Sequence, residues 1–237
     1  MSKKKKIWIA IGCAVLAAVI GLGVYFFGFH LPQQRKLEEQ KRWVRAYYEA
    51  KIAAYTEENK KYAPFEVDVA FLGDSLTDGY DLAHFYPQYV TANRGIGGDT
   101  TFGLYDRLQV SAYDLQPKVV VMLIGANNFD TMFQNYEDIV KGLRENLPET
   151  KVVLLSLTSM SGEWGKNNQK AAYNNAKIKL VAEKYGCAFV DLYTPLMNLA
   201  TGEIFPEYTT DGGHLTAAGY QVFTDTLTPV LEELLGK

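Results

Sequence analysis

The chain has 237 residues, of which 48% are hydrophobic and 13% aromatic, and its net charge is −3. This length suits one globular domain with an additional segment, and the slightly acidic balance offers no basic surface for nucleic acid, so we expect no nucleic-acid partner. The sequence contains neither an HExxH nor a CxxC motif. A zinc enzyme is therefore not indicated, and we expect no metal and no other cofactor.

The N-terminus combines a basic tail with an apolar segment. Residues 1–6 include four consecutive lysines, and residues 7–29 carry no charged side chain. As a helix, the apolar segment would span about 34 Å, enough for the ~30 Å hydrocarbon core of a bilayer. A cleaved signal peptide is the alternative. Its apolar core would be only about 7–15 residues long and would end at small residues, whereas this segment ends in bulky Tyr25 and Phe29.

We therefore predict that residues 7–29 form an uncleaved, single-pass anchor in the cell membrane. Positively charged flanks remain on the cytoplasmic side of such anchors. Residues 1–6 are accordingly predicted to be a cytoplasmic tail, and everything after His30 is predicted to be extracytoplasmic.

Residues 30–64 differ in composition from the anchor. They are rich in Lys, Arg, Glu and Gln, and they place aromatic side chains such as Trp43 and Tyr47 at spacings of three and four. This periodicity predicts an amphipathic helix. We interpret it as a helical stalk that precedes a globular domain at residues 65–237.

The globular domain alternates apolar runs with helical patterns. The predicted strands are residues 67–72, 89–92, 119–124, 152–157 and 188–192, and the predicted helices are residues 101–109, 136–146, 167–185 and 216–235. Apolar strands that alternate with helices indicate a parallel sheet covered on both faces, a three-layer α/β/α sandwich. Functional sites in such folds form beyond the carboxyl ends of the strands.

A serine follows the first predicted strand, in the sequence GDSLT at residues 73–77. Ser75 could be a nucleophile or could only cap the next helix. A nucleophilic serine needs a neutral imidazole to accept its proton and an acid to orient that imidazole. Asp211 lies three residues before His214, just ahead of the last predicted helix. This pair meets both needs, although Asp211 could also serve only as a helix cap.

Ester chemistry also needs hydrogen-bond donors already in place for the tetrahedral oxyanion. The backbone N–H of Ser75, an amide of the glycine turn at residues 95–98 and the side chain of Asn127 are candidates. The glycine turn does not have the GxGxxG spacing of a dinucleotide site. Asn127 and Asn128 could instead be a simple turn pair.

Four short motifs now occur in one order: GDSL at 73–76, GGD at 97–99, GANN at 125–128 and DGGH at 211–214. In these motifs the chain resembles the SGNH (GDSL) hydrolases over about residues 67–235. The wider pattern is similar to the platelet-activating-factor acetylhydrolase-like branch of that family. One departure is Asn128, which stands where the third motif often has an aspartate.

The resemblance implies a flavodoxin-like SGNH fold with a five-stranded parallel sheet, and it implies roles for residues by position. Ser75 would be the nucleophile, His214 the general base and acid, and Asp211 the residue that orients His214. The oxyanion donors would be the Ser75 N–H, the Gly98 N–H and the Asn127 side chain. The family also implies a shallow, open site that favours short acyl groups such as acetyl.

We therefore predict a membrane-anchored serine esterase that acts on short-chain, acetyl-type esters of extracytoplasmic carbohydrates or lipids. An acyltransferase with the same residues and a non-catalytic glycan-binding domain on the same fold are the alternatives. Tyr80, His84, Phe129 and Trp164 lie in loops that could line the pocket. No individual substrate-binding residue and no oligomeric state is predicted.

Overall fold

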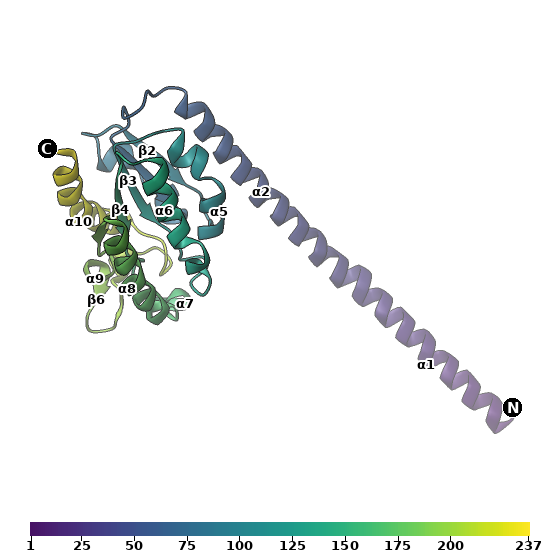
Figure 1. Cartoon of the computed structure of the whole chain (residues 1–237). Helices are drawn as coiled ribbons and strands as arrows, with labels where there is room; N and C mark the ends of the chain where they lie inside the picture. The colour runs from purple at the N-terminus through teal and green to yellow at the C-terminus, as the bar shows by residue number, and fades with distance from the viewer. The chain divides into compact units, whose positions relative to one another are not determined.

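The computed structural model describes residues 1–237, which divide into two compact units, residues 1–50 and 51–237. The chain begins with one continuous helix from Lys3 to Asn59. It consists of α1 (Lys3–Tyr25), a π-helical turn η1 (Phe26–His30) and α2 (Leu31–Asn59), which follow one another in Figure 1. The division between the units falls within α2 and within the predicted stalk.

The apolar part of this helix is a candidate membrane span. No residue of α1 is buried, and its most apolar 18-residue window has a mean hydropathy of 2.5. By length and composition the helix can cross a membrane, a test that an N-terminal signal sequence also passes. The predicted apolar helix is therefore confirmed in its length and composition, and its orientation in a membrane stays a prediction.

The second unit is built on a five-stranded parallel sheet in the order β2-β1-β3-β4-β5. Its strands are β1 (Val69–Gly73), β2 (Thr91–Gly95), β3 (Val119–Leu123), β4 (Lys151–Leu155) and β5 (Ala188–Val190). Every residue of the central strands β1 and β3 is buried, because helices cover both faces of the sheet. The predicted α/β/α sandwich is confirmed (Figure 1).

Four longer helices cover the sheet. They are α5 (Thr101–Asp106), α6 (Tyr136–Asn146), α8 (Asn168–Tyr185) and α10 (Ala217–Leu235). α6 contacts both α5 and α8, whereas α10 contacts β3 and β5. Right-handed crossovers place α5, α6 and α8 on one face, and they place the connection from β1 to β2 on the other face. On that other face Tyr80 stacks on Tyr220 of α10.

Short elements complete the second unit. They are α3 (Ser75–Asp78), α4 (Leu82–Phe85), η2 (Gln109–Tyr113), η3 (Met132–Gln134), α7 (Gly162–Gly165), α9 (Tyr193–Leu196), β6 (Met197–Asn198), β7 (Glu203–Ile204) and η4 (Pro206–Tyr208). β6 and β7 form a small antiparallel pair. Most of these elements lie in the connections that follow strands, where the candidate site is built.

Two predicted elements have different bounds in the structure. The second strand was expected at residues 89–92, but β2 runs from Thr91 to Gly95 and includes Asn93 and Arg94. The side chains of these two residues have polar partners in the fold, so an edge strand can contain them without apolar periodicity. The helix expected at residues 101–109 is interrupted, since α5 ends at Asp106 and the π-helical turn η2 begins at Gln109.

Candidate active site

The candidate site lies at the carboxyl ends of three neighbouring strands. Ser75 is the first residue of α3, directly after β1, and Gly98 lies in the loop after β2. Asn127 lies in the loop after β3, and His214 lies in the loop before α10. Parallel strands bring their carboxyl ends to one edge of the sheet, so four distant parts of the chain meet there.

Ser75, His214 and Asp211 form a hydrogen-bonded row. His214 Nε2 lies 3.0 Å from Ser75 Oγ, and His214 Nδ1 lies 2.7 Å from Asp211 Oδ2. The backbone N–H of His214 also donates to Asp211 Oδ1 at 2.8 Å. The distances fit a serine that can transfer its proton to an imidazole held in one orientation by a carboxylate.

The charge of Asp211 is stabilised by its own loop. Its carboxylate accepts hydrogen bonds from the backbone N–H of His214, from the His214 side chain and from the backbone N–H of Gly213. These bonds lower the pKa of Asp211 to about 2. Asp211 is therefore ionised throughout the neutral range and is suited to orient the Nδ1–H of His214.

The three predicted oxyanion donors carry uncommitted hydrogens. The backbone N–H groups of Ser75 and Gly98 donate to no other group of the protein. Asn127 Nδ2 donates one hydrogen to the carbonyl of Asp99 at 2.8 Å, which leaves its second hydrogen available. Gly98 has φ +78, a conformation that an L residue adopts only with strain. This backbone turn leaves the Gly98 amide free to bind an anion.

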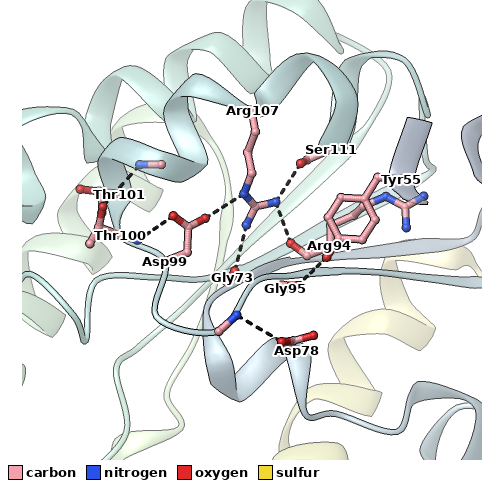
Figure 2. Close-up of polar contacts among 12 residues, drawn as sticks. Tyr55, Gly73, Asp78, Arg94, Gly95, Asp99, Thr100, Thr101, Arg107 and Ser111 are labelled. Carbon is pink, nitrogen blue, oxygen red and sulfur yellow. Dashed lines mark hydrogen bonds and ion pairs between the residues drawn. The ribbon is translucent and has the colours of Figure 1, made fainter. Parts of the chain in front are cut away.

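A buried guanidinium ties the segments of the site together. Arg107 Nε pairs with Asp99 Oδ2 at 2.8 Å, and its terminal nitrogens donate to the carbonyls of Gly73 and Arg94 and to Ser111 Oγ. Figure 2 shows Arg107 at the centre of these contacts. Gly73 precedes the nucleophile loop and Asp99 follows Gly98. Arg107 therefore connects the ends of β1 and β2 with the glycine loop.

Asp74 is an unusual neighbour of Ser75. Its carboxyl group is buried and accepts the backbone N–H of Leu76 at 3.2 Å, as an N-cap of α3. Burial is the main cause that raises its pKa to about 7, and the charge of Asp99 adds to the effect. Asp74 therefore titrates near neutral pH next to the serine.

A small pocket opens over Ser75. Its volume is ≈ 40 Å³, and its lining includes Ser75, Asn127, Met160, Trp164 and His214. The Trp164 ring meets the His214 ring edge to face at 6.2 Å. A cavity of ≈ 510 Å³ shares Asn127 and Trp164 with this pocket. The narrow pocket over Ser75 thus adjoins a wider cavity through Asn127 and Trp164.

A comparison with protein families shows the family of the chain. Residues 71–222 match the model of the GDSL-like Lipase/Acylhydrolase family. The chain belongs to this family. The resemblance predicted from the four short motifs is confirmed, and the chain is a GDSL acylhydrolase.

Solved structures support the same identification. A Streptococcus pneumonia protein provisionally described as a platelet activating factor is 26% identical, with a TM-score of 0.76 over 84% of this chain and 99% of that chain. A Bacteroides fragilis protein provisionally described as an acylhydrolase is 27% identical, with a TM-score of 0.69 over 76% of this chain and 95% of that chain. A GDSL-like lipase from Bacteroides thetaiotaomicron is 26% identical, with a TM-score of 0.68 over 77% of this chain and 97% of that chain. A search of curated proteins found no significant match.

The four loop residues that could line the pocket of this acylhydrolase have different environments. Trp164 lines the Ser75 pocket, and Phe129 lines the adjoining cavity. His84 is exposed and lines neither space, and Tyr80 is only 3% exposed and packs against Phe71, Tyr86 and Phe223. Tyr80 therefore belongs to the core and not to the pocket, because its position after α3 directs the ring inward.

Sequence reasoning missed the polar residues behind the site of the acylhydrolase. Arg107 has no motif of its own and lies among surface-type residues of a predicted helix. Asp78, four residues after Asp74, accepts the backbone N–H of Gly97 at 3.1 Å. Only the tertiary contacts identify these residues, since each bonds to a segment that is distant in sequence.

Proposed function

We propose that this GDSL acylhydrolase is a serine esterase in which Ser75 is the nucleophile, His214 the general base and acid, and Asp211 the residue that orients His214. The observation that carries the proposal is the hydrogen-bonded row from Ser75 Oγ through His214 to Asp211. Family membership supports ester hydrolysis as the reaction class.

The first half-reaction forms an acyl enzyme. The Ser75 hydroxyl transfers its proton to His214 Nε2 as Oγ attacks the ester carbonyl carbon. The resulting oxyanion accepts hydrogen bonds from the N–H groups of Ser75 and Gly98 and from the Asn127 amide. When the carbon–oxygen bond to the alcohol breaks, His214 gives its proton to the departing oxygen.

The second half-reaction releases the acid. A water molecule loses a proton to His214 Nε2 and attacks the acyl carbon, and Ser75 leaves with that proton. The side chains of Asp211 and His214 are both nearly half exposed, 47% and 45%. Water therefore has direct access to the acyl enzyme. This access is what hydrolysis of the acyl enzyme requires.

The two spaces around Ser75 support a short acyl group on a larger alcohol. The pocket over Ser75 has a volume of only ≈ 40 Å³, which favours a short acyl group such as acetyl over a long chain. The ≈ 510 Å³ cavity has room for a sugar unit. Its lining combines the Trp164 ring with the side chains of Asn127, Asn128 and Asn167, a combination suited to a polar ring with apolar faces. We therefore infer acetylated carbohydrate as the substrate class.

We further propose that residues 7–29 anchor the enzyme in the cell membrane and that the catalytic unit is extracytoplasmic, with residues 1–6 in the cytoplasm. The apolar helix and the lysines before it support this orientation. Protease added to wall-free cells with an intact membrane should digest the catalytic unit. A catalytic unit that stays uncut while a known outward-facing protein is cut would refute the orientation.

The catalytic assignment is tested with a fluorophosphonate probe and p-nitrophenyl acetate. The full-length protein in detergent should be labelled at Ser75, as located by mass spectrometry, and should hydrolyse the ester. Ser75→Ala should lose both signals while the near-ultraviolet circular dichroism stays unchanged. Ser161→Ala is the matched control, because the Ser161 side chain makes no hydrogen bond and does not line the pocket. Undiminished turnover by Ser75→Ala would disprove the assignment.

A further inference from the structure

The last turns of α2 present one polar face to the catalytic unit. Lys51, Tyr55, Glu58 and Asn59 are spaced at i, i+4, i+7 and i+8, so their side chains lie on one stripe of the helix. All four belong to the second compact unit. We call these four residues the clamp face.

Tyr55 holds the carbonyl at the start of the glycine loop. Its side chain is only 4% exposed, and its hydroxyl donates to the carbonyl of Gly95 at 2.5 Å. The guanidinium of Arg94 lies over the Tyr55 ring, 4.8 Å from its centroid. Figure 2 shows Tyr55 beside Arg94 and Gly95. Tyr55 therefore contacts the backbone three residues before Gly98.

Lys51 reaches the same loop through a carboxylate. Its ammonium group pairs with Asp78, whose other oxygen, Oδ2, accepts the backbone N–H of Gly97 at 3.1 Å. Gly97 precedes Gly98 directly. The backbone of Gly95 also lies against α3, since a Cβ there would come within 2.2 Å of the Asp78 nitrogen. The loop thus has little space to shift on this side.

The remaining clamp residues fix the strand that leads into the loop. Arg94 is fully buried in β2, pairs with Glu58 at 2.7 Å and donates to Asn59 Oδ1 at 2.9 Å. On its other side the loop is held by Arg107, which pairs with Asp99. Gly98 therefore lies between two sets of polar contacts, although it is itself exposed.

We propose that the clamp face positions the glycine loop for oxyanion stabilisation, with Lys51 and Tyr55 as positioning residues for the Gly98 N–H. This role rests on the proposed esterase function. An oxyanion donor acts only if it is aimed before the reaction begins. Because Gly97 and Gly98 have no side chains to pack, polar contacts from neighbouring elements must hold their backbone. The clamp face belongs to the same continuous helix as the candidate membrane span.

The test compares isosteric variants of the full-length protein in detergent. Tyr55→Phe removes only the hydroxyl, and Lys51→Met removes only the charge. Each should lower kcat for p-nitrophenyl acetate about three- to tenfold, with KM within about twofold, because a donor to the oxyanion acts mainly in the transition state. Tyr62→Phe and Lys60→Met are the matched controls and should keep the wild-type kcat. Tyr62 makes no hydroxyl hydrogen bond, and Lys60 pairs only with exposed Glu57.

A second measurement separates positioning from general support of the fold. A boronic acid forms a tetrahedral adduct with a catalytic serine and so resembles the transition state. The affinity for the boronic acid should therefore fall in parallel with kcat in Tyr55→Phe and Lys51→Met. Lys51→Arg should keep most of the wild-type affinity. Equal boronate affinity in all variants would overturn the positioning role, even if the thermal midpoints fell. Wild-type protein that neither turns over the ester nor labels at Ser75 would instead overturn the esterase function, and the positioning role with it.

Discussion

Replacement of Asp74 by asparagine should change how stability depends on pH. The Asp74 carboxyl group has a pKa of about 7 in the folded protein because it is buried, against 3.8 for the ordinary side chain. Between these values the folded protein binds one proton more than the unfolded chain. The free energy of unfolding therefore decreases as pH rises from about 4 to about 7.

The size of this effect follows from the difference between the two pKa values. The difference is about three, and at 1.36 kcal/mol for each unit it corresponds to about 4 kcal/mol as an upper bound. Asparagine keeps an oxygen that can accept the backbone N–H of Leu76 and has no charge to bury. Asp74→Asn should thus match the wild type near pH 4 and exceed its stability by up to about 4 kcal/mol at pH 8.

This difference in stability is measured by urea unfolding of the full-length protein in detergent at several pH values. Near-ultraviolet circular dichroism monitors the unfolding. Groups that do not interact with Asp74 contribute equally to both proteins and cancel in the comparison, whereas Asp99 loses a neighbouring charge in Asp74→Asn. Asp114→Asn is the matched control, because Asp114 is exposed. If the wild type and Asp74→Asn lost stability in parallel between pH 4 and pH 8, the raised pKa of the buried Asp74 carboxyl group would be refuted.

The remaining predictions concern turnover of p-nitrophenyl acetate. Asn127→Ala should lower kcat by roughly 10²–10³-fold, since it removes one of the proposed oxyanion donors; a negligible loss would exclude Asn127 from the oxyanion hole. Asp211→Asn should lower kcat by roughly 10²–10⁴-fold, because an amide has no charge to stabilise the protonated imidazole and its N–H₂ group can donate to Nδ1, which holds His214 in the wrong tautomer; wild-type kcat would contradict the proposed orienting role. Gly98→Ala should lower the free energy of unfolding by about 1–2 kcal/mol, because Gly98 has a positive φ that alanine adopts only with strain. The variant should also have a lower kcat, while the probe still labels Ser75. Wild-type stability and kcat would show that this conformation of Gly98 is not needed.

Much of the fold follows from local sequence patterns. The run Val119–Leu123 is apolar at every position, which is typical of a central parallel strand with helices on both sides. The helix of residues 136–146 was predicted with the bounds that α6 has, because its apolar residues recur at helical spacing. Patterns of this kind depend on neighbouring residues only, so they can be recognised without the tertiary structure.

The candidate site was predicted in outline from motifs, each of which ends a strand or begins a helix. Ser75, Gly98 and Asn127 were expected at one edge of the sheet, because each follows a predicted parallel strand, and the family resemblance implied that Asp211 and His214 join them. Their distances could not be predicted. The 3.0 Å contact joins Ser75 and His214 across 139 positions of the chain, and only the packing of the α10 loop against α3 sets it.

The sequence alone determined the class of the sheet, the apolar helix and the motif residues of the site, since these depend on composition, periodicity and order along the chain. Only the tertiary structure decided what holds the site in place. Arg107 bonds to Gly73, 34 residues away, and Tyr55 bonds to Gly95, 40 residues away. Such polar contacts have no periodicity, because a buried polar group requires a partner at one point in space and not at one spacing in the sequence.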